Sequence, residues 1–238
     1  MTHSSVDGRA GRVEQVHESS YQETHGVRRR GPAAITAMIS RFAARALEVP
    51  LVYRLLQAPF QERKIAPCLA QLHLTPQTRL LDVGCGPGTN AHHFAHTLYT
   101  GIDVNQDYVH SARRRHAGRF VVGDATNPDV LPREQFDIIL LNSLMHHLPD
   151  DAVAHLLSRL VLRLALQGRI HILDLILPPD ASAARLLARM DRGRFARPLD
   201  AWHALFAQSM HIEQMSTFPL GVPGLPLWHM VYCIGGAV

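Results

Sequence analysis

The stretch Leu80-Leu81-Asp82-Val83-Gly84-Cys85-Gly86-Pro87-Gly88-Thr89-Asn90 decides which fold we expect for this chain. Its apolar start predicts a buried strand, and glycine at alternate positions predicts a tight turn that enters a helix. The free backbone N–H groups at a helix N-terminus attract a carboxylate or a phosphate, and glycines let such a ligand approach closely. The stretch therefore predicts a strand, a ligand-binding loop and a helix over about 88–97.

Strand-like and helix-like segments alternate after this loop. We expect strands at 79–83, 99–103, 120–122, 136–141 and 169–175. We expect helices at 106–116 and 150–166, with Gly168 as the signal that ends the second helix. Such alternation is typical of an α/β fold, a Rossmann-like doubly wound sheet that is mostly parallel.

The pattern changes after Pro178-Pro179. Helices are expected at 181–190 and 199–209, followed by strands at 211–218 and 226–234. The two strands lie close together in sequence around a turn-rich segment, which predicts an antiparallel C-terminal hairpin at the sheet edge. The complete sheet would then have seven strands.

The first 75 residues contain no such alternation. Residues 1–30 are polar and non-periodic, which predicts a disordered tail. An N-terminal helical segment is expected over 31–75. Its first helix ends before Pro50, and Pro59 and Pro67 interrupt two shorter stretches at about 50–58 and 60–73.

Composition excludes several classes of protein. The 238 residues carry a formal net charge of +4, which is mild and scattered, so a nucleic-acid partner is not expected. The densest basic cluster, Arg28-Arg29-Arg30, is interpreted as a solvated linker. No apolar run approaches the roughly 20 residues of a membrane span, and the polar start does not resemble a signal peptide. A cytoplasmic location is the resulting expectation.

Cysteines and histidines give no metal-binding pattern. Cys68, Cys85 and Cys233 are far apart and odd in number, which argues against a disulfide framework and against a zinc site. The sixteen histidines are dispersed and lack an HExxH pattern. No metal is therefore expected.

The glycine loop has a distinctive spacing. It reads GxGxG after Asp82, whereas a dinucleotide-binding fingerprint reads GxGxxG. This pattern resembles motif I of class I S-adenosylmethionine-dependent methyltransferases. The resemblance implies S-adenosylmethionine as the cofactor, with contacts from Asp82, Gly84, Cys85, Gly86 and Gly88. Asp82 could also serve mainly to hold the loop by hydrogen bonding.

Three further strand ends match the family. Asp103, followed by Val104, stands where the family's acidic residue accepts the ribose hydroxyls. Asp124 stands where an aspartate faces the adenine amine, and the backbone amide of Ala125 would face a ring nitrogen. Asn142 stands where the family contacts the methionine end. Each carboxylate taken alone could be a helix cap, but all these positions lie at carboxyl ends of parallel strands, where open α/β sheets bind ligands.

The stretches 136–150 and 168–174 are similar to the small-molecule branch of the family, of the ubiquinone/menaquinone-biosynthesis type. The resemblance implies methyl transfer to a small organic acceptor, with O- or C-methylation preferred. A base is needed only if the acceptor is protonated, and a histidine suits that role. His147, and less strongly His146, are the candidates, and the alternative is that His147 only holds its loop by hydrogen bonding.

The parts outside the core are expected to carry acceptor specificity. In the family, such regions form the substrate lid, here the segment 31–75 and helices at about 180–210 of a domain spanning 76–238. The stretch 191–198, with three arginines, is either a lid that contacts an anionic acceptor or a solvated connector. Trp202, Phe206 and Trp228 either line an apolar pocket or, as we favour, belong to the core.

Two other functions remain open. One is a nicotinamide-dependent oxidoreductase, and the other is a non-catalytic S-adenosylmethionine-binding module. The sequence Asn142-Ser143-Leu144-Met145 departs from the Asn/Asp-Pro-Pro-Tyr/Phe motif of enzymes that methylate nucleic-acid bases. The acceptor, the methylated atom and whether the chain forms a homodimer are not given by the sequence.

Overall fold

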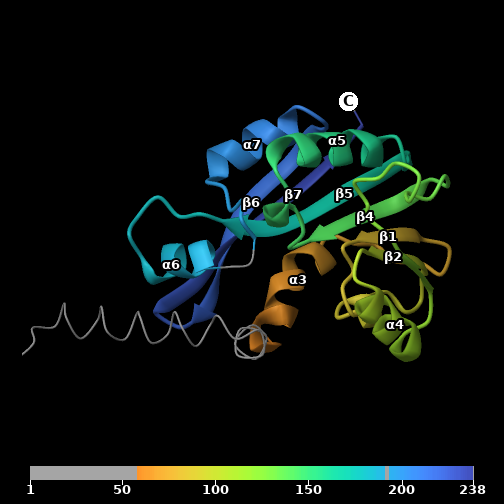
Figure 1. Cartoon of the computed structure of the whole chain (residues 1–238), viewed down its shortest axis with the longest axis horizontal. Coiled ribbons are helices and arrows are strands. Elements are labelled where there is room, and N and C mark those ends of the chain that lie inside the picture. Colours follow the sequence, from red (N-terminus) through yellow and green to blue (C-terminus); the bar gives the residue numbers. More distant parts are fainter. Residues whose placement is uncertain (1–57, 191–192, 238) are drawn as a thin grey trace, which may run out of the picture. The chain divides into compact units, whose positions relative to one another are not determined.

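The computed structural model describes residues 58–190 and 193–237, which belong to one compact unit. The tail, the first expected helix and nearly all of the second lie outside these residues. Seven strands form one sheet in the order β3-β2-β1-β4-β5-β7-β6 (Figure 1). The strands are β1 (Arg79–Val83), β2 (Leu98–Asp103), β3 (Arg119–Val122), β4 (Phe136–Asn142), β5 (Leu164–Ile176), β6 (His211–Val222) and β7 (Leu225–Gly236).

The pairing confirms the Rossmann-like, mostly parallel sheet. Strands β3, β2, β1, β4 and β5 pair in parallel, and β7 is antiparallel to both β5 and β6. The hairpin β6–β7 therefore closes one edge of the sheet, as expected. The helical elements are η1 (Ala58–Phe60), α3 (Gln61–Leu69), η2 (Ala91–Phe94), α4 (Gln106–Arg115), η3 (Met145–His147), α5 (Asp150–Val161), α6 (Ala183–Met190) and α7 (Leu199–Ala207).

Helices cover both faces of the sheet (Figure 1). Because successive strand residues point to opposite faces, Leu81 and Val83 pack under α5 and α7, whereas Leu80 packs with Ile65 of α3 and Val109 of α4. A third apolar cluster joins α6 to the ends of β5, β6 and β7. The strands are thus buried on both sides, and their carboxyl ends remain as the place for a site.

One expected helix was wrong, and a second ends earlier than expected. The residues after the glycine loop form only the 3-10 turn η2, because Gly88 has a φ of 79° and the bonds that follow it span three residues. Helix α5 ends at Val161, and Gly168 lies inside β5 instead of capping a helix. A Cβ at Gly168 would lie 2.5 Å from the carbonyl oxygen of Phe136, so glycine permits the close approach of β4 and β5. Pro67 lies inside α3 without interrupting it.

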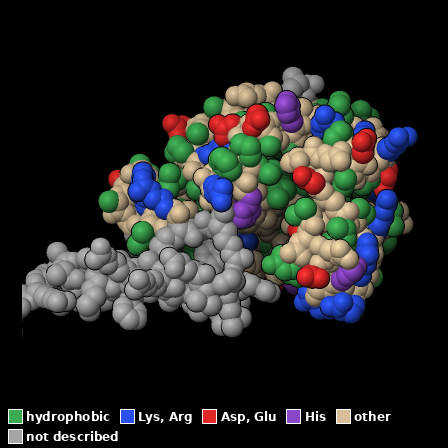
Figure 2. All heavy atoms as spheres, viewed as in Figure 1, with side chains coloured by type: hydrophobic (Ala, Val, Ile, Leu, Met, Phe, Trp, Pro, Cys, Tyr) green, Lys and Arg blue, Asp and Glu red, His purple; other side chains and the backbone are tan. Residues whose placement is uncertain are grey.

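Charged side chains are mixed on the face seen in Figure 2. Figure 2 shows Lys and Arg side chains in several separate groups, with acidic side chains between them, on the visible face. No helix among the described residues is long and apolar enough to cross a membrane.

Candidate cofactor and active site

The glycine loop folds back over β2. Gly84, Gly86 and Gly88 all have positive φ, a conformation that glycine adopts without a steric penalty. The backbone N–H groups of Gly84 and Cys85 donate to the carbonyl of Ile102, at 2.8 and 3.0 Å. A Cβ added at Gly86 would meet no atom within 4 Å, so the loop is open at this residue.

Asp103, at the end of β2, holds this loop. Its Oδ2 accepts from the backbone N–H of Gly86 at 2.8 Å, and its Oδ1 accepts from that of Asn105 at 2.8 Å. The next side chain, Val104, is 70% exposed although it is apolar. The role of pinning the loop, considered for Asp82 from the sequence, is therefore performed by Asp103.

Asp82 lies in the core. Its Oδ2 accepts from the Tyr99 hydroxyl at 2.7 Å. Burial raises the pKa of Asp82 to about 7, and the Tyr99 hydrogen bond only partly offsets this. Cys85 is also buried, with its sulfur 2.8 Å from where a Cβ on Gly101 would stand, and burial raises the pKa of its thiol. The side chains of Asp82 and Cys85 thus pack in the core beneath the loop.

The next two strand ends differ in exposure. Asp124, after β3, is exposed, and its Oδ1 accepts from both the backbone N–H and the hydroxyl of Thr126. Ala125 is half-buried. Asn142 ends β4 and accepts from the Ser143 hydroxyl at 3.3 Å. Ser143 has a φ of 57°, a strained conformation for a side chain other than glycine.

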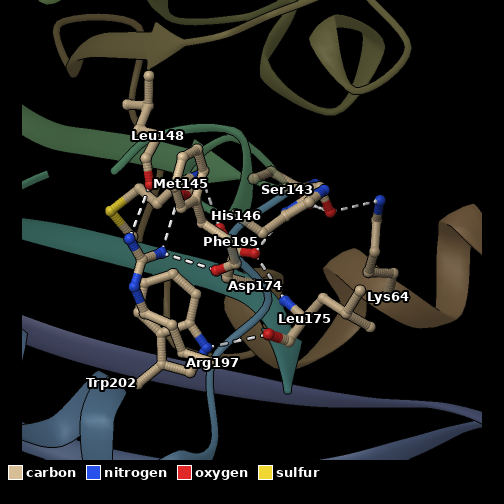
Figure 3. Close-up of polar contacts among 11 residues, drawn as sticks. Lys64, Ser143, Met145, His146, Leu148, Asp174, Leu175, Phe195, Arg197 and Trp202 are labelled. Carbon is tan, nitrogen blue, oxygen red and sulfur yellow. Dashed lines mark hydrogen bonds and ion pairs between the residues drawn. The ribbon is translucent and has the colours of Figure 1, made fainter. Parts of the chain in front are cut away.

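A lysine that sequence reasoning missed reaches this end of β4. The Lys64 ammonium donates to the Ser143 hydroxyl oxygen at 3.1 Å (Figure 3). Lys64 comes from α3 and is half-buried. Nothing in the local sequence marks it, because 79 positions separate the two partners.

His146 is the more buried of the two candidate histidines. It is 3% exposed, and its Nδ1 lies 2.6 Å from Oδ1 of Asp174, which is fully buried in β5 (Figure 3). Asp174 also accepts from the backbone N–H groups of Met145 and Leu175. His147 is exposed, with its ring 4.2 Å from that of His146. The two candidate histidines therefore differ in burial and in their contacts.

Arg197 closes this network from the segment before α7. Its guanidinium donates to the carbonyls of Met145 and Leu148 (Figure 3). It also pairs with Asp150 and stacks 4.5 Å from the centre of the Trp202 ring. Arg197 is 6% exposed and so belongs neither to a solvated connector nor to an open lid. Arg194 is exposed, whereas residues 191 and 192 lie outside the described part.

The three aromatic residues considered as pocket lining are buried. Trp202 and Phe206 belong to the core under α5 and α7, and the Trp202 indole donates to the carbonyl of Leu175. Trp228 belongs to the cluster beside α6, and its indole nitrogen has no hydrogen-bond partner among the described residues. The core interpretation is thus confirmed for all three.

Comparison with known proteins identifies the domain. Residues 80–168 match the family model of a methyltransferase domain. The chain is 45% identical over 69 residues to a fatty-acid O-methyltransferase of Mycolicibacterium smegmatis, covering 26% of this chain and 25% of that protein. Over 184 residues it is 26% identical to a trans-aconitate 2-methyltransferase of Afipia carboxidovorans, covering 73% and 70%.

A solved structure agrees with the fold. A TehB-like SAM-dependent methyltransferase from Corynebacterium glutamicum superposes with a TM-score of 0.55 at 17% identity, covering 85% of this chain and all of that one. The chain carries a class I S-adenosylmethionine-dependent methyltransferase domain. The cofactor of the methyltransferase domain is S-adenosylmethionine.

The carboxyl edge of the methyltransferase sheet fits such a cofactor. The open side of Gly86 leaves room for close approach, and the exposed Val104 offers an apolar surface beside it. Each oxygen of Asp103 accepts one backbone N–H and retains a lone pair for a hydroxyl group. The exposed Asp124 can accept from an amine. These groups come from neighbouring strand ends, as a nucleoside requires.

Proposed function

We propose that this methyltransferase domain transfers a methyl group to a carboxylate oxygen of a small organic acid. The observation that carries the methyl-transfer part is the glycine loop, which is open at Gly86 and held from β2 by Asp103. We propose the cofactor contacts at this loop, at Val104, at Asp124 with Ala125, and at Asn142. The methyl group bound to a sulfonium is already activated, so the protein's task is to position the acceptor and exclude water.

The acceptor class is supported by two independent features. The relatives are named for a fatty acid and for trans-aconitate, and both compounds are carboxylic acids. In this chain, the Lys64 ammonium stands half-buried at the end of β4, beside Asn142 and Ser143. An ammonium in such a place can bind an acceptor carboxylate. We therefore propose carboxylic acids as the small organic acceptors and, of the two expected reactions, O-methylation rather than C-methylation.

A carboxylate acceptor changes the role expected for the histidines. Carboxylic acids are ionised at neutral pH, since their pKa is about 4, so transfer to oxygen needs no general base. His146 is then a positioning residue, fixed by Asp174 so that the turn 143–148 keeps its shape below the acceptor. His147, exposed beside it, takes no proton from the substrate in this mechanism.

The acceptor lid is proposed from the same contacts. Helix α3 lies within the segment 31–75 and reaches both Ser143 and, through the Arg63 guanidinium, the carbonyl of Gly221. Helix α6 packs against the ends of β5 and β7. We propose that these two helices line the acceptor side of the site.

The first test is calorimetric titration of S-adenosylhomocysteine into the full chain, with Asp103→Ala as the variant. Binding in the micromolar range that is lost in Asp103→Ala is expected. An oxidoreductase would instead bind a nicotinamide cofactor and leave S-adenosylhomocysteine unbound, which would overturn the proposal.

The second test is transfer of a labelled methyl group to fatty acids, to trans-aconitate and to the corresponding amides. We expect product from acids only, with an increase in KM of tenfold or more in Lys64→Met and little change in the control Arg114→Met, which removes an exposed cation of α4. Equal transfer to amides would refute the carboxylate acceptor. Cofactor binding without transfer to any compound of the panel would favour the non-catalytic module.

A further inference from the structure

Two neighbouring histidines and a glutamate meet beside the glycine loop. His92 and His93 lie on η2, the turn directly after the loop, and Glu62 lies on α3. The His92 Nε2 atom is 3.5 Å from Oε1 of Glu62, and the His93 Nε2 atom is 3.2 Å from Oε2. The three residues offer one ligand atom each, all within 4.8 Å of one another.

These separations are those of ligands around one zinc ion. Zinc binds histidine nitrogen and carboxylate oxygen at about 2.0–2.2 Å, and four such ligands are tetrahedral. Two ligand atoms at that radius and angle lie roughly 3.3–3.5 Å apart. The Glu62 carboxylate meets this value at both histidines, but with different oxygens, at 3.5 Å from Oε1 to His92 and 3.2 Å from Oε2 to His93. Rotation of the side chains would bring the three ligand atoms, which lie within 4.8 Å of one another, around one ion.

The two imidazoles are also arranged as ligands. Nδ1 of His92 lies 3.0 Å from the carbonyl oxygen of Thr89, which places its proton on Nδ1 and leaves the Nε2 lone pair toward Glu62. Nε2 of His93 is buried and lacks a partner with hydrogen-bond geometry among the described residues, even though Glu62 is at ion-pair distance.

We propose that Glu62, His92 and His93 bind one zinc ion, with water as the fourth ligand. This proposal departs from the expectation of no metal, since Glu62 is thirty positions from the adjacent histidines and no spacing motif joins them. The ion connects α3 to the turn that follows the glycine loop. Zinc binding therefore stabilises the contact between α3 and the turn after the glycine loop. The site does not depend on which acceptor is methylated.

The simpler alternative is a surface ion pair between Glu62 and a protonated histidine. Such a pair needs no metal and contributes little, because the Glu62 side chain is 68% exposed. The two arrangements can be distinguished by measurement, because only the metal site binds zinc stoichiometrically and requires all three side chains.

The experiment titrates zinc chloride into the tag-free, chelator-treated full chain by calorimetry, and adds cobalt as a spectroscopic probe. We expect one site per chain, the visible absorption of four-coordinate cobalt, and a higher melting temperature with zinc than with chelator. Affinity should fall at least tenfold in Glu62→Gln and in His93→Gln. The control His110→Gln removes an exposed histidine of α4 and should bind zinc like the wild type.

Because Glu62 is exposed, Glu62→Gln is expected to fold normally, and circular dichroism checks this for each variant. Zinc binding that is equal in the wild type, Glu62→Gln and His93→Gln would place the metal on other histidines and overturn the proposal. Absence of a stoichiometric site in the wild type would overturn it as well, in favour of the ion pair.

Discussion

The buried carboxyl of Asp82 should make the domain less stable as pH rises, and Asp82→Asn should remove this dependence. The pKa of Asp82 is raised from 3.8 in the unfolded chain to about 7, chiefly by burial. Between these values the folded protein keeps a proton that the unfolded chain releases, so stability falls with increasing pH. The destabilisation is absent below pH 3.8 and complete above about pH 7. Asparagine has no proton to lose and can still accept from the Tyr99 hydroxyl.

The magnitude follows from the pKa shift. About two pH units of the shift lie between pH 5 and 7, and each contributes about 1.4 kcal/mol, which gives about 3 kcal/mol. The free energy of unfolding in urea, measured from pH 5 to 8, should therefore rise by that amount in Asp82→Asn relative to the wild type. Asp129→Asn, which removes an exposed carboxylate, controls for the lost charge. A difference between Asp82→Asn and wild type that is constant over this range would refute the assignment of a neutral buried carboxyl.

Three further predictions concern stability and reactivity. Arg197→Met should lower the free energy of unfolding by about 3 kcal/mol or more in urea, because unpaired buried carbonyls cost roughly 1–3 kcal/mol each. Arg197→Lys should recover only part of this, and full recovery would contradict the multiple contacts of the guanidinium. Gly168→Ala should lower the free energy of unfolding by roughly 1–3 kcal/mol. The control Gly236→Ala, whose Cβ would lie 3.5 Å from its nearest neighbours, should lower it by less than about 0.5 kcal/mol. Equal losses in the two variants would be inconsistent with the close approach at Gly168. Iodoacetamide should label the buried cysteines Cys68, Cys85 and Cys233 only after unfolding, because burial raises the pKa of each thiol. Mass spectrometry would detect the label, and rapid labelling of the native chain would be evidence against their burial.

The strands could be predicted closely, and the reason is physical. Strands buried on both faces contain continuous apolar runs, such as Ile138 to Leu141, and such runs are visible without tertiary information. The helix that was wrong and the helix end that was misplaced both involve glycines. A glycine in sequence does not reveal whether it ends a helix or admits a neighbouring strand, and Gly168 does the second. The sequence likewise does not reveal the positive φ of Gly88, after which the chain forms a short 3-10 turn in place of a helix.

The site was predictable where the chain itself brings residues together. Asp103, Asp124 and Asn142 each follow a parallel strand, so the topology alone places them at one edge. Asp174 and Lys64 act through partners 28 and 79 positions away, and no local pattern records such contacts. Sequence similarity favoured His147 over His146, whereas burial and the carboxylate of Asp174 distinguish His146.

Helix α3 belongs to the site more closely than its position before the α/β domain suggests. Three consecutive residues reach three different elements: Glu62 contacts the histidines of η2, Arg63 donates to Gly221 in the hairpin, and Lys64 donates to Ser143 after β4. Successive residues of a helix point about 100° apart, so one helix can make all three contacts only if it lies between those elements. Ile65, fully buried in the core shared with α4, holds the helix there. The boundary expected near residue 75 therefore separates α3 from a sheet with which it forms one site. The helix contributes Lys64 to the proposed acceptor side and Glu62 to the proposed metal site beside the glycine loop.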